Sequence, residues 1–426
     1  MENKSQGVIW NATTDQTTKV QGENLSSAKQ RNMAKGNRPN ASVFNYMTKR
    51  QISEWLAKNP YKELLTYIND RVMGQEETVA VVTNIYNYLK RMGKPDLICE
   101  KARQTRSNAN NMLLCAPSGC GKTETYRALK DYFAKEIPLL RISITDVSGL
   151  TAAGYRGSDP TDILKPFLGY SPEPIGIVFM DEFDKICSPS FNANNGNMHM
   201  EVQGSMLTMI EGGKVEVGDD RTRSVISTGN LLFVGIGSFD SFRKDRESEA
   251  KTAIGFGQEE SETNTGNHHD PIKREDIIEA GGCYELIGRF SYIVNYHPLD
   301  KDVVLRIIEK NRQRIATDFD CDLVLKEPVL DSLCERANSK FGCRLLDSLI
   351  RDLVLTACGD ALLSGLSGDV LEISLESMNQ YTYQFRSFTD EEKEKQVAFA
   401  PYNENEQDVS DARMNFEERL NALFAN

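Results

Sequence analysis

Residues 112–123 carry the clearest chemical signal in the chain, because an apolar run leads there into Ala-Pro-Ser-Gly-Cys-Gly-Lys-Thr. A strand, a glycine-rich turn and the start of a helix, in that order, are typical of a phosphate-binding loop. Glycines allow backbone N–H groups to converge on phosphate oxygens, and the N-terminus of the following helix adds more. In such a loop Lys122 reaches the β- and γ-phosphates, and the Thr123 hydroxyl binds Mg²⁺. The loop residues expected to bind nucleotide are Ser118, Gly119, Cys120, Gly121, Lys122 and Thr123.

Two consecutive carboxylates, Asp181 and Glu182, follow the apolar residues Ile-Val-Phe-Met at 177–180. This pattern predicts a buried parallel strand whose C-terminal end faces a ligand. Asp181 is then expected near Mg²⁺, and Glu182 is expected to be the general base that orients the attacking water. Taken alone, the segment also fits a core strand followed by a solvated acidic turn. Its combination with the phosphate-binding loop favours an ATP hydrolase that uses ATP and Mg²⁺.

Length, charge and cysteine usage limit the remaining possibilities. A chain of 426 residues is long enough for two or more hydrophobic cores. No apolar run approaches the ~18 residues of a membrane helix and no leader peptide is evident, so we expect no membrane contact and a cytoplasmic location. A net charge of −12 argues against nucleic acid as a partner. Nine cysteines without a C-x-x-C pair indicate reduced thiols rather than disulfides or a zinc site.

The distribution of apolar residues divides the chain into four parts. Residues 1–50 are polar and expected to be disordered, because they bury too little surface to offset the entropy of ordering. They are interpreted as a solvated tail, with a partner-binding arm as the alternative. Strand and helix patterns then alternate over 51–298, which indicates an α/β domain with a parallel sheet. The pattern over residues 299–376 predicts a small, mostly α-helical domain. The composition of residues 377–426 indicates a polar, acidic extension.

Several motifs, in the same order, resemble those of the ClpX-type AAA+ protein unfoldases over roughly residues 60–376. The resemblance rests on the combination, which is far more specific than a phosphate-binding loop alone. It implies an AAA+ fold, with an αβα large domain that carries the phosphate-binding loop and a small, mostly α-helical domain after it. The matching segments are 72–75 (V-M-G-Q), 116–123 (A-P-S-G-C-G-K-T), 146–157 (D-V-S-G-L-T-A-A-G-Y-R-G), 178–186 (V-F-M-D-E-F-D-K-I), 285–290 (E-L-I-G-R-F) and 341–345 (F-G-C-R-L).

The resemblance implies further nucleotide contacts. Val72 and Met73 would line the adenine pocket, and Arg344 would contact the nucleotide from the small domain. Arg289 would reach the ATP site of a neighbouring subunit and stabilise charge that develops on the γ-phosphate. A residue supplied by a neighbour requires a head-to-tail interface, and head-to-tail interfaces that close form rings. The family implies a ring of six identical subunits. Outside this setting, either arginine is interpreted as a member of a surface salt bridge.

Two segments imply contacts with other proteins. Tyr155 resembles the pore-loop aromatic that grips an extended polypeptide, a contact that needs no specific hydrogen bonds. Arg156 stands where the family has an apolar residue, which favours acidic substrates. Ile254, Gly255 and Phe256 resemble the family's I-G-F loop, which docks on the ClpP peptidase ring, and an exposed anchor of this kind fits a partner's pocket. Taken alone, these segments also fit a glycine-bounded turn and a loop folded back on its own domain.

The chain also departs from the family pattern. Ala116 stands where the phosphate-binding loop usually begins with Gly, and Cys120 within the loop is either a buried, inert thiol or an oxidant-sensitive one. Residues 1–50 contain no cysteine, so the family's N-terminal zinc pattern is missing from them. Ser238 is the only polar candidate for the first sensor position.

The leading interpretation is an ATP-dependent unfoldase that translocates protein substrates through a ring and delivers them to a ClpP-type peptidase. A stand-alone remodeller of one complex is the first alternative, and the I-G-F segment argues against it. A nucleic-acid-associated AAA+ ATPase is the second, opposed by the acidic charge and by Tyr155. The third alternative is a nucleotide-bound scaffold without turnover. The presence of both a general base and an arginine finger argues against it, because a scaffold needs neither.

Overall fold

The computed structural model describes eleven stretches of the chain, and expectations about other residues lie outside this described part. The stretches are 41–94, 110–151, 158–191, 196–218, 223–240, 242, 271–319, 321–337, 343–365, 368–377 and 380–389. Within them no helix combines the length and the apolarity that crossing a bilayer requires.

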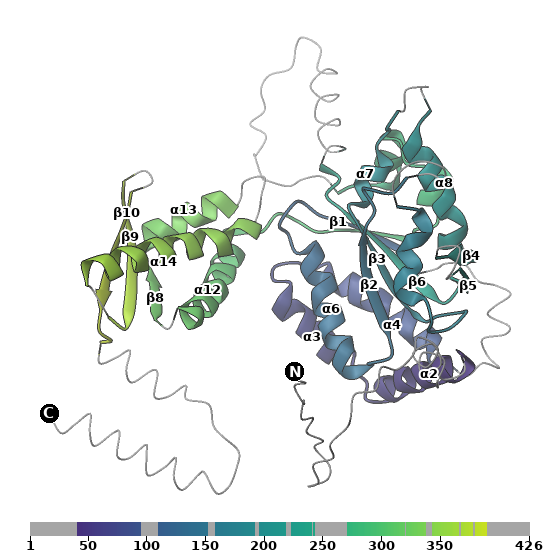
Figure 1. Cartoon of the computed structure of the whole chain (residues 1–426), viewed down its shortest axis with the longest axis horizontal. Helices are drawn as coiled ribbons and strands as arrows, with labels where there is room; N and C mark the ends of the chain where they lie inside the picture. Colours follow the sequence, from purple (N-terminus) through teal and green to yellow (C-terminus); the bar gives the residue numbers. More distant parts are fainter. Residues whose placement is uncertain are drawn as a thin grey trace, which may run out of the picture.

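A parallel sheet of five strands, in the order β2-β3-β6-β1-β7, forms the centre of the large domain (Figure 1). Two strands, β1 and β6, are buried along their whole length, as expected of central strands in a parallel sheet. On one edge of β1, Leu114 pairs with Ile236, and on the other it pairs with Val294. The strands span Met112–Cys115 (β1), Arg141–Asp146 (β2), Gly176–Asp181 (β3), Leu231–Gly237 (β6) and Tyr292–Asn295 (β7).

Helices cover both faces of this sheet, which makes the large domain the predicted αβα sandwich. Alternate strand residues point to opposite faces: Met112 and Leu114 belong to one hydrophobic core, and Leu113 and Cys115 belong to the other. The first core contains α2 (Ala41–Ala57), α3 (Tyr61–Arg71), α4 (Thr78–Met92) and α6 (Lys122–Glu136). The second contains η1 (Pro160–Phe167), α7 (Phe183–Cys187), α8 (Met198–Ile210), α10 (Arg274–Glu279), α11 (Tyr284–Ile287) and the hairpin of β4 (Lys214–Val217) and β5 (Ser224–Ser227).

Helix α2 begins at Ala41 in the described part of the chain, ahead of the expected domain boundary at residue 51. Trp55 anchors this helix, since its ring is buried against Tyr132 and Phe133 of α6 and its indole N–H donates to the Tyr132 hydroxyl (3.3 Å). Closer to the start of the helix, the ring of Phe44 packs edge-on against Tyr170. The helix therefore belongs to the large domain rather than to a polar tail.

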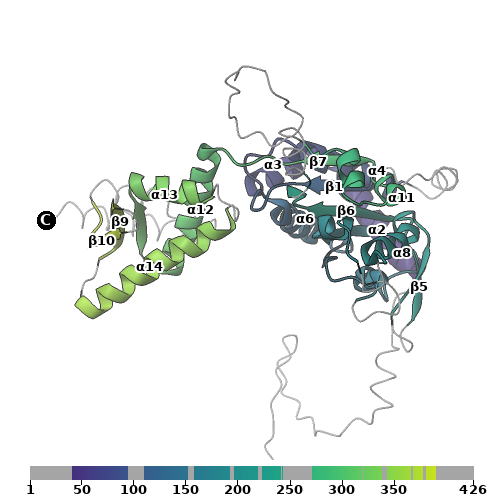
Figure 2. The ribbon, with the colours of Figure 1, turned by 90° about the horizontal axis from the view of Figure 1, so that it is seen from above.

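The small domain combines three helices with a three-stranded sheet, and it lies beside the large domain in both views (Figures 1 and 2). Its core is formed by apolar residues of the helices and of the sheet. The sheet includes β10, which extends the domain to Arg386, beyond the expected boundary at residue 376. The elements are α12 (Lys301–Asp318), β8 (Asp322–Leu325), α13 (Glu327–Ala337), α14 (Arg344–Ser364), β9 (Val370–Ser377) and β10 (Gln380–Arg386).

Candidate nucleotide site

The phosphate-binding loop follows directly from β1 and ends where α6 begins at Lys122. Gly119 and Gly121 have φ angles of 79° and 95°, a left-handed conformation that residues with a Cβ rarely adopt. The carbonyl of Gly121 accepts hydrogen bonds from both the backbone N–H and the hydroxyl of Thr125, in the first turn of α6. The loop thus leads tightly into the N-terminus of a helix, which is the geometry that favours anion binding.

Lys122 is held by the loop itself. Its ammonium group donates to the carbonyl oxygens of Ala116 and Pro117 (3.0 Å for the second), and its side chain is almost fully buried. Burial lowers the pKa of Lys122, while the nearby negative charges of Asp184 and Asp240 act in the opposite direction. The two carbonyls therefore satisfy the ammonium group within the loop.

The two predicted carboxylates lie at the C-terminal end of β3. Glu182 has a φ of 57°, so a residue with a side chain adopts the left-handed conformation directly after a buried strand. Strain of this kind is concentrated at functional sites. The backbone N–H of Glu182 donates to the carboxylate of Asp181 (3.0 Å). Partial burial, together with the negative charges of Asp184 and Asp181, raises the pKa of Glu182.

A third carboxylate in the same segment, Asp184, was not predicted. It is buried, and it accepts hydrogen bonds from the hydroxyl of Ser238 (3.1 Å) and from the backbone N–H of Phe239 (3.4 Å). The candidate for the first sensor position therefore bonds to the acidic segment after β3. The sequence signal was present in D-E-F-D at 181–184, where a third acid follows at helical spacing.

A cleft of about 620 Å³ separates the phosphate-binding loop from the small domain. Its charged lining comprises six cations and only two carboxylates, which suits a polyphosphate. The predicted residues that line it are Val72, Met73, Gly119, Cys120, Gly121, Lys122, Thr123 and Arg344. The lining residues that were not predicted are Arg71, Glu124, Arg127, Leu299, Ile307, Lys310, Asn311, Arg314, Cys343 and Asp347.

Among the predicted site residues that the structure describes, four do not line this cleft: Ser118, Asp181, Glu182 and Arg289. The sheet order explains the position of the two carboxylates, because β6 lies between β3 and β1. Arg289 follows α11 and forms an ion pair with Glu211, at the end of α8 (2.5 Å). It is half exposed and so remains outside the nucleotide cleft of its own subunit.

Helix α12 supplies the wall of the cleft that sequence reasoning missed. Ile307, Lys310, Asn311 and Arg314 recur at helical spacing on one face of α12, and all four line the cleft. Arg314 also pairs with Asp347 of α14 (2.5 Å). No residue type among the four is diagnostic of nucleotide binding, so only the folded arrangement identifies them.

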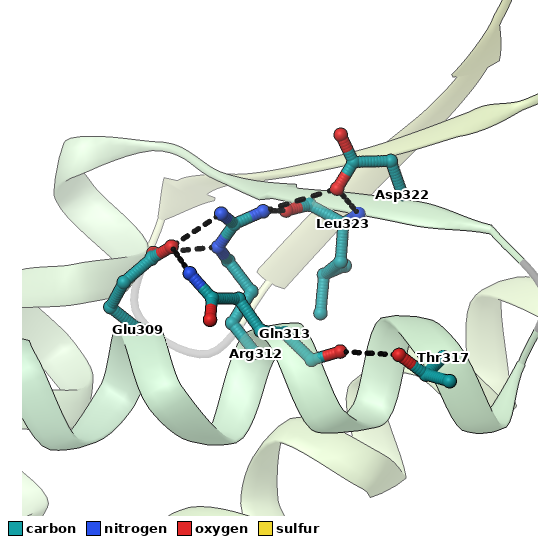
Figure 3. Close-up of polar contacts among 6 residues, drawn as sticks. All are labelled: Glu309, Arg312, Gln313, Thr317, Asp322 and Leu323. Atoms are coloured by element: carbon teal, nitrogen blue, oxygen red, sulfur yellow. Dashed lines mark hydrogen bonds and ion pairs between the residues drawn. The ribbon is translucent and has the colours of Figure 1, made fainter. Parts of the chain in front are cut away.

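Arg312 fixes the orientation of that helix (Figure 3). Its guanidinium pairs with Glu309 on α12 (2.5 Å) and with Asp322 on β8 (3.3 Å), and it donates to the carbonyl of Leu323. The hydrogen bond from Arg312 to Glu309 raises the pKa of Arg312, which stays charged at any physiological pH. With α12 anchored to β8, the face that bears Lys310 is directed to the cleft.

The pore and docking segments lie outside the described residues. This applies to Tyr155 and Arg156, and equally to Ile254, Gly255 and Phe256. The acidic substrate preference and the peptidase contact remain predictions from sequence.

Comparisons with known proteins agree with the fold. Residues 107–293 match the model of the AAA domain (Cdc48 subfamily). The chain is 30% identical, over 350 residues, to the ATP-dependent Clp protease ATP-binding subunit ClpX of Treponema denticola, which covers 75% of this chain and 81% of the relative. It is 27% identical over 348 residues to the protein of the same name from Azotobacter vinelandii, covering 73% of this chain and 77% of that one. The chain therefore belongs to the ClpX family of AAA+ ATPases and is a nucleotide-binding ATP hydrolase.

Proposed function

We propose that this ATPase unfolds proteins, translocates them through the pore of a homohexameric ring and delivers them to a ClpP-type peptidase. The observation that carries the proposal is the cleft itself, whose walls come from both domains. A ligand that bridges two domains changes their relative position when it is hydrolysed or released. The names of the ClpX relatives as ATP-binding subunits of the Clp protease support the choice of partner.

Most of the proposed contacts with ATP involve residues that line the cleft. Val72 and Met73 bind the adenine, and the loop from Gly119 to Thr123 surrounds the phosphates together with Ser118, which lies outside the lining. Lys122 exchanges its carbonyl partners for phosphate oxygens, and Arg344 adds a second positive charge from the first turn of α14. Glu182 accepts a proton from the water that attacks the γ-phosphate. Its raised pKa, caused by burial and by neighbouring carboxylates, makes it a better proton acceptor than an exposed glutamate.

The residues present fit Mg²⁺. Hydroxyl and carboxylate oxygens are the ligands that Mg²⁺ prefers, and it commonly takes only one or two from the protein. Burial raises the pKa of Glu182, and the negative charges of Asp184 and Asp181 raise it further, so the end of β3 carries negative charge that favours a cation. Thr123 and Asp181 would hold the ion. When bound, Mg²⁺ offsets negative charge on the β- and γ-phosphate oxygens.

Arg289 acts on the ATP of a neighbouring subunit in this proposal. It is half exposed and stands apart from the cleft of its own chain, so it is available to a second copy. A head-to-tail contact of this kind repeats around a closed ring. Tyr155 and Arg156 would then face the central pore, and Ile254, Gly255 and Phe256 would contact the peptidase.

The test is degradation of a tagged, stable fluorescent protein by the purified full chain with ATP, Mg²⁺ and ClpP. Loss of fluorescence should require ATP, and it should be absent in Glu182→Gln, which removes the base. Phe256→Ala should also abolish it, while ATP hydrolysis by that variant persists.

Two outcomes would contradict the proposal in different ways. ATP hydrolysis without loss of fluorescence would favour the stand-alone remodeller, which acts on one specific complex. Loss of fluorescence by Phe256→Ala in the absence of ClpP would favour an unfoldase that works without a peptidase.

A further inference from the structure

Gln75 has no assigned role, although it ends the V-M-G-Q segment whose first two residues line the cleft. Its side chain is only 4% exposed, and its amide makes three hydrogen bonds. The Nε2 group donates to the carbonyl of His297 (2.8 Å) and to the carbonyl of Cys120 in the phosphate-binding loop (3.4 Å). Its Oε1 accepts from the backbone N–H of His297 (3.0 Å). One side chain thus joins the loop to the chain segment that follows β7.

His297 is the first residue of the segment that joins the two domains. Tyr296, just before it, is fixed to the large domain: its N–H donates to the carbonyl of Cys115 (2.8 Å), and its buried hydroxyl bonds to the hydroxyl of Thr125 (3.0 Å). Helix α12 of the small domain begins at Lys301. Residues 297–300 form the domain linker. Its first residue is His297, whose backbone N–H and carbonyl are both bonded to the side chain of Gln75.

The residues next to Gln75 contact the linker and α12 as well. Gly74 has a φ of 73°, and a Cβ placed there would lie 2.7 Å from both methyl groups of Val303, in the first turn of α12. Only glycine permits this approach. The carboxylate of Glu77 lies 2.6 Å from Nε2 of the His297 ring. Residues 74–77 thus touch the linker at its beginning and the small domain at its first helical turn.

We propose that Gln75 is a positioning residue that couples the phosphate-binding loop to the domain linker, so that nucleotide in the cleft sets the orientation of the small domain. This inference rests on the proposed binding of ATP in the cleft. When a phosphate takes over Lys122, the carbonyls of Ala116 and Pro117 lose the ammonium group, and the loop, in which Pro117 also accepts from the backbone N–H of Cys120, adjusts. The bond from Gln75 to Cys120 is the longest of its three, so it changes first. A shift there is passed to His297, and through the linker to α12.

A purely structural role would make Gln75 equivalent to Gln203, which has the same pattern of bonds elsewhere. Gln203 is fully buried, donates to the carbonyls of Ile186 (2.9 Å) and Gly281 (3.3 Å), and accepts from the N–H of Cys283 (2.6 Å). These partners all belong to the large domain, and none lies in the linker. Gln203 is therefore a matched control for the loss of a buried, three-bonded amide.

The experiment is hydrogen–deuterium exchange measured by mass spectrometry on the full chain, with and without a slowly hydrolysed ATP analogue and Mg²⁺. In the unmodified protein, the analogue should protect the phosphate-binding loop and change exchange across residues 296–304. In Gln75→Met, loop protection should remain, and exchange at the linker should be roughly five- to tenfold faster, the effect of losing a hydrogen bond. It should no longer respond to the analogue. Gln203→Met should keep the linker response.

Gln75→Glu keeps the bond from the His297 N–H but donates to neither carbonyl, so it tests the coupling if Gln75→Met fails to fold. A linker response of normal size in either folded variant would overturn the coupling alone. Loss of the response in Gln203→Met would also overturn it, because any buried amide would then suffice. Absence of loop protection in the unmodified protein would overturn the proposed function, and the coupling with it.

Discussion

The ion pair between Arg289 and Glu211 holds the proposed arginine finger within its own subunit, and we expect Glu211→Gln to increase ATP turnover. The guanidinium Nη2 lies 2.5 Å from Oε1 of Glu211, so the pair must separate before Arg289 can reach a neighbouring ATP. Glutamine is nearly isosteric with glutamate and removes only the charge. The variant therefore weakens the retention of Arg289 without opening a cavity.

The size of the effect follows from the exposure of the pair. The two side chains are 49% and 37% exposed, so solvent screens the attraction. Pairs of this kind contribute about 0.2–1 kcal/mol, which corresponds to a roughly 1.4- to fivefold change in the population of unpaired Arg289. Turnover at saturating ATP should rise within that range. The rise should shrink with added salt, because the screening length falls from about 10 Å at 0.1 M to about 3 Å at 1 M.

Steady-state ATP hydrolysis by the full chain provides the assay, with Arg289→Ala as the reference. That variant should lose roughly 10³-fold or more in turnover if the finger acts in trans. The double variant should match Arg289→Ala, since Glu211 then has nothing to hold. The reasoning would be refuted if Glu211→Gln lost activity as Arg289→Ala does, because Glu211 would then support the productive position of Arg289.

Two further predictions concern the cleft and the fold. Gly121 has a φ of 95°, and in Gly121→Ala the added Cβ would lie 3.0 Å from a methyl group of Val72. ATP binding, measured by calorimetry, should therefore weaken at least about tenfold. The thermal unfolding midpoint should shift only slightly. An unchanged affinity would show that the loop conformation does not matter. Trp55→Ala should lower the free energy of unfolding, measured with denaturant, by about 3–5 kcal/mol, because a buried ring that packs on α6 is removed. A loss under about 1 kcal/mol would show that α2 packs independently of the domain.

The phosphate-binding loop could be predicted because its determinants are local. Two glycines with left-handed conformations follow a fully buried strand, and Lys122 begins the next helix. The same applies to Asp181 and Glu182, because Asp181 ends a strand whose other residues are all buried and Glu182 follows it directly. The order of the strands could not be predicted from the sequence, because β6 pairs with β1 across more than a hundred residues and with β3 across more than fifty.

The ends of the folded region were misjudged for a different reason. Residues 41–50 have a polar composition on average, but Phe44 contacts Tyr170, and Asn45 donates to the carbonyl of Glu173 (2.9 Å). The composition of a short segment does not reveal such long-range partners, so the helix could not be predicted from it. Strand β10 did carry a signal, since aromatic and polar residues alternate in Q-Y-T-Y-Q-F-R and its aromatic residues pack on the core of the small domain.

The electrostatics of the cleft give a reason why its two walls should respond to ATP. Burial is the main cause that lowers the pKa of Lys122; the negative charges of Asp240 and Asp184 act in the opposite direction, and the positive charge of Arg344, from the opposite domain, makes the smallest contribution. Lys122 and Arg344 are both positive, and both line the cleft. We therefore propose that a triphosphate placed between them attracts both walls of the cleft. In this proposal, loss of the γ-phosphate weakens that attraction, so hydrolysis loosens the cleft without any change in the covalent structure of the protein.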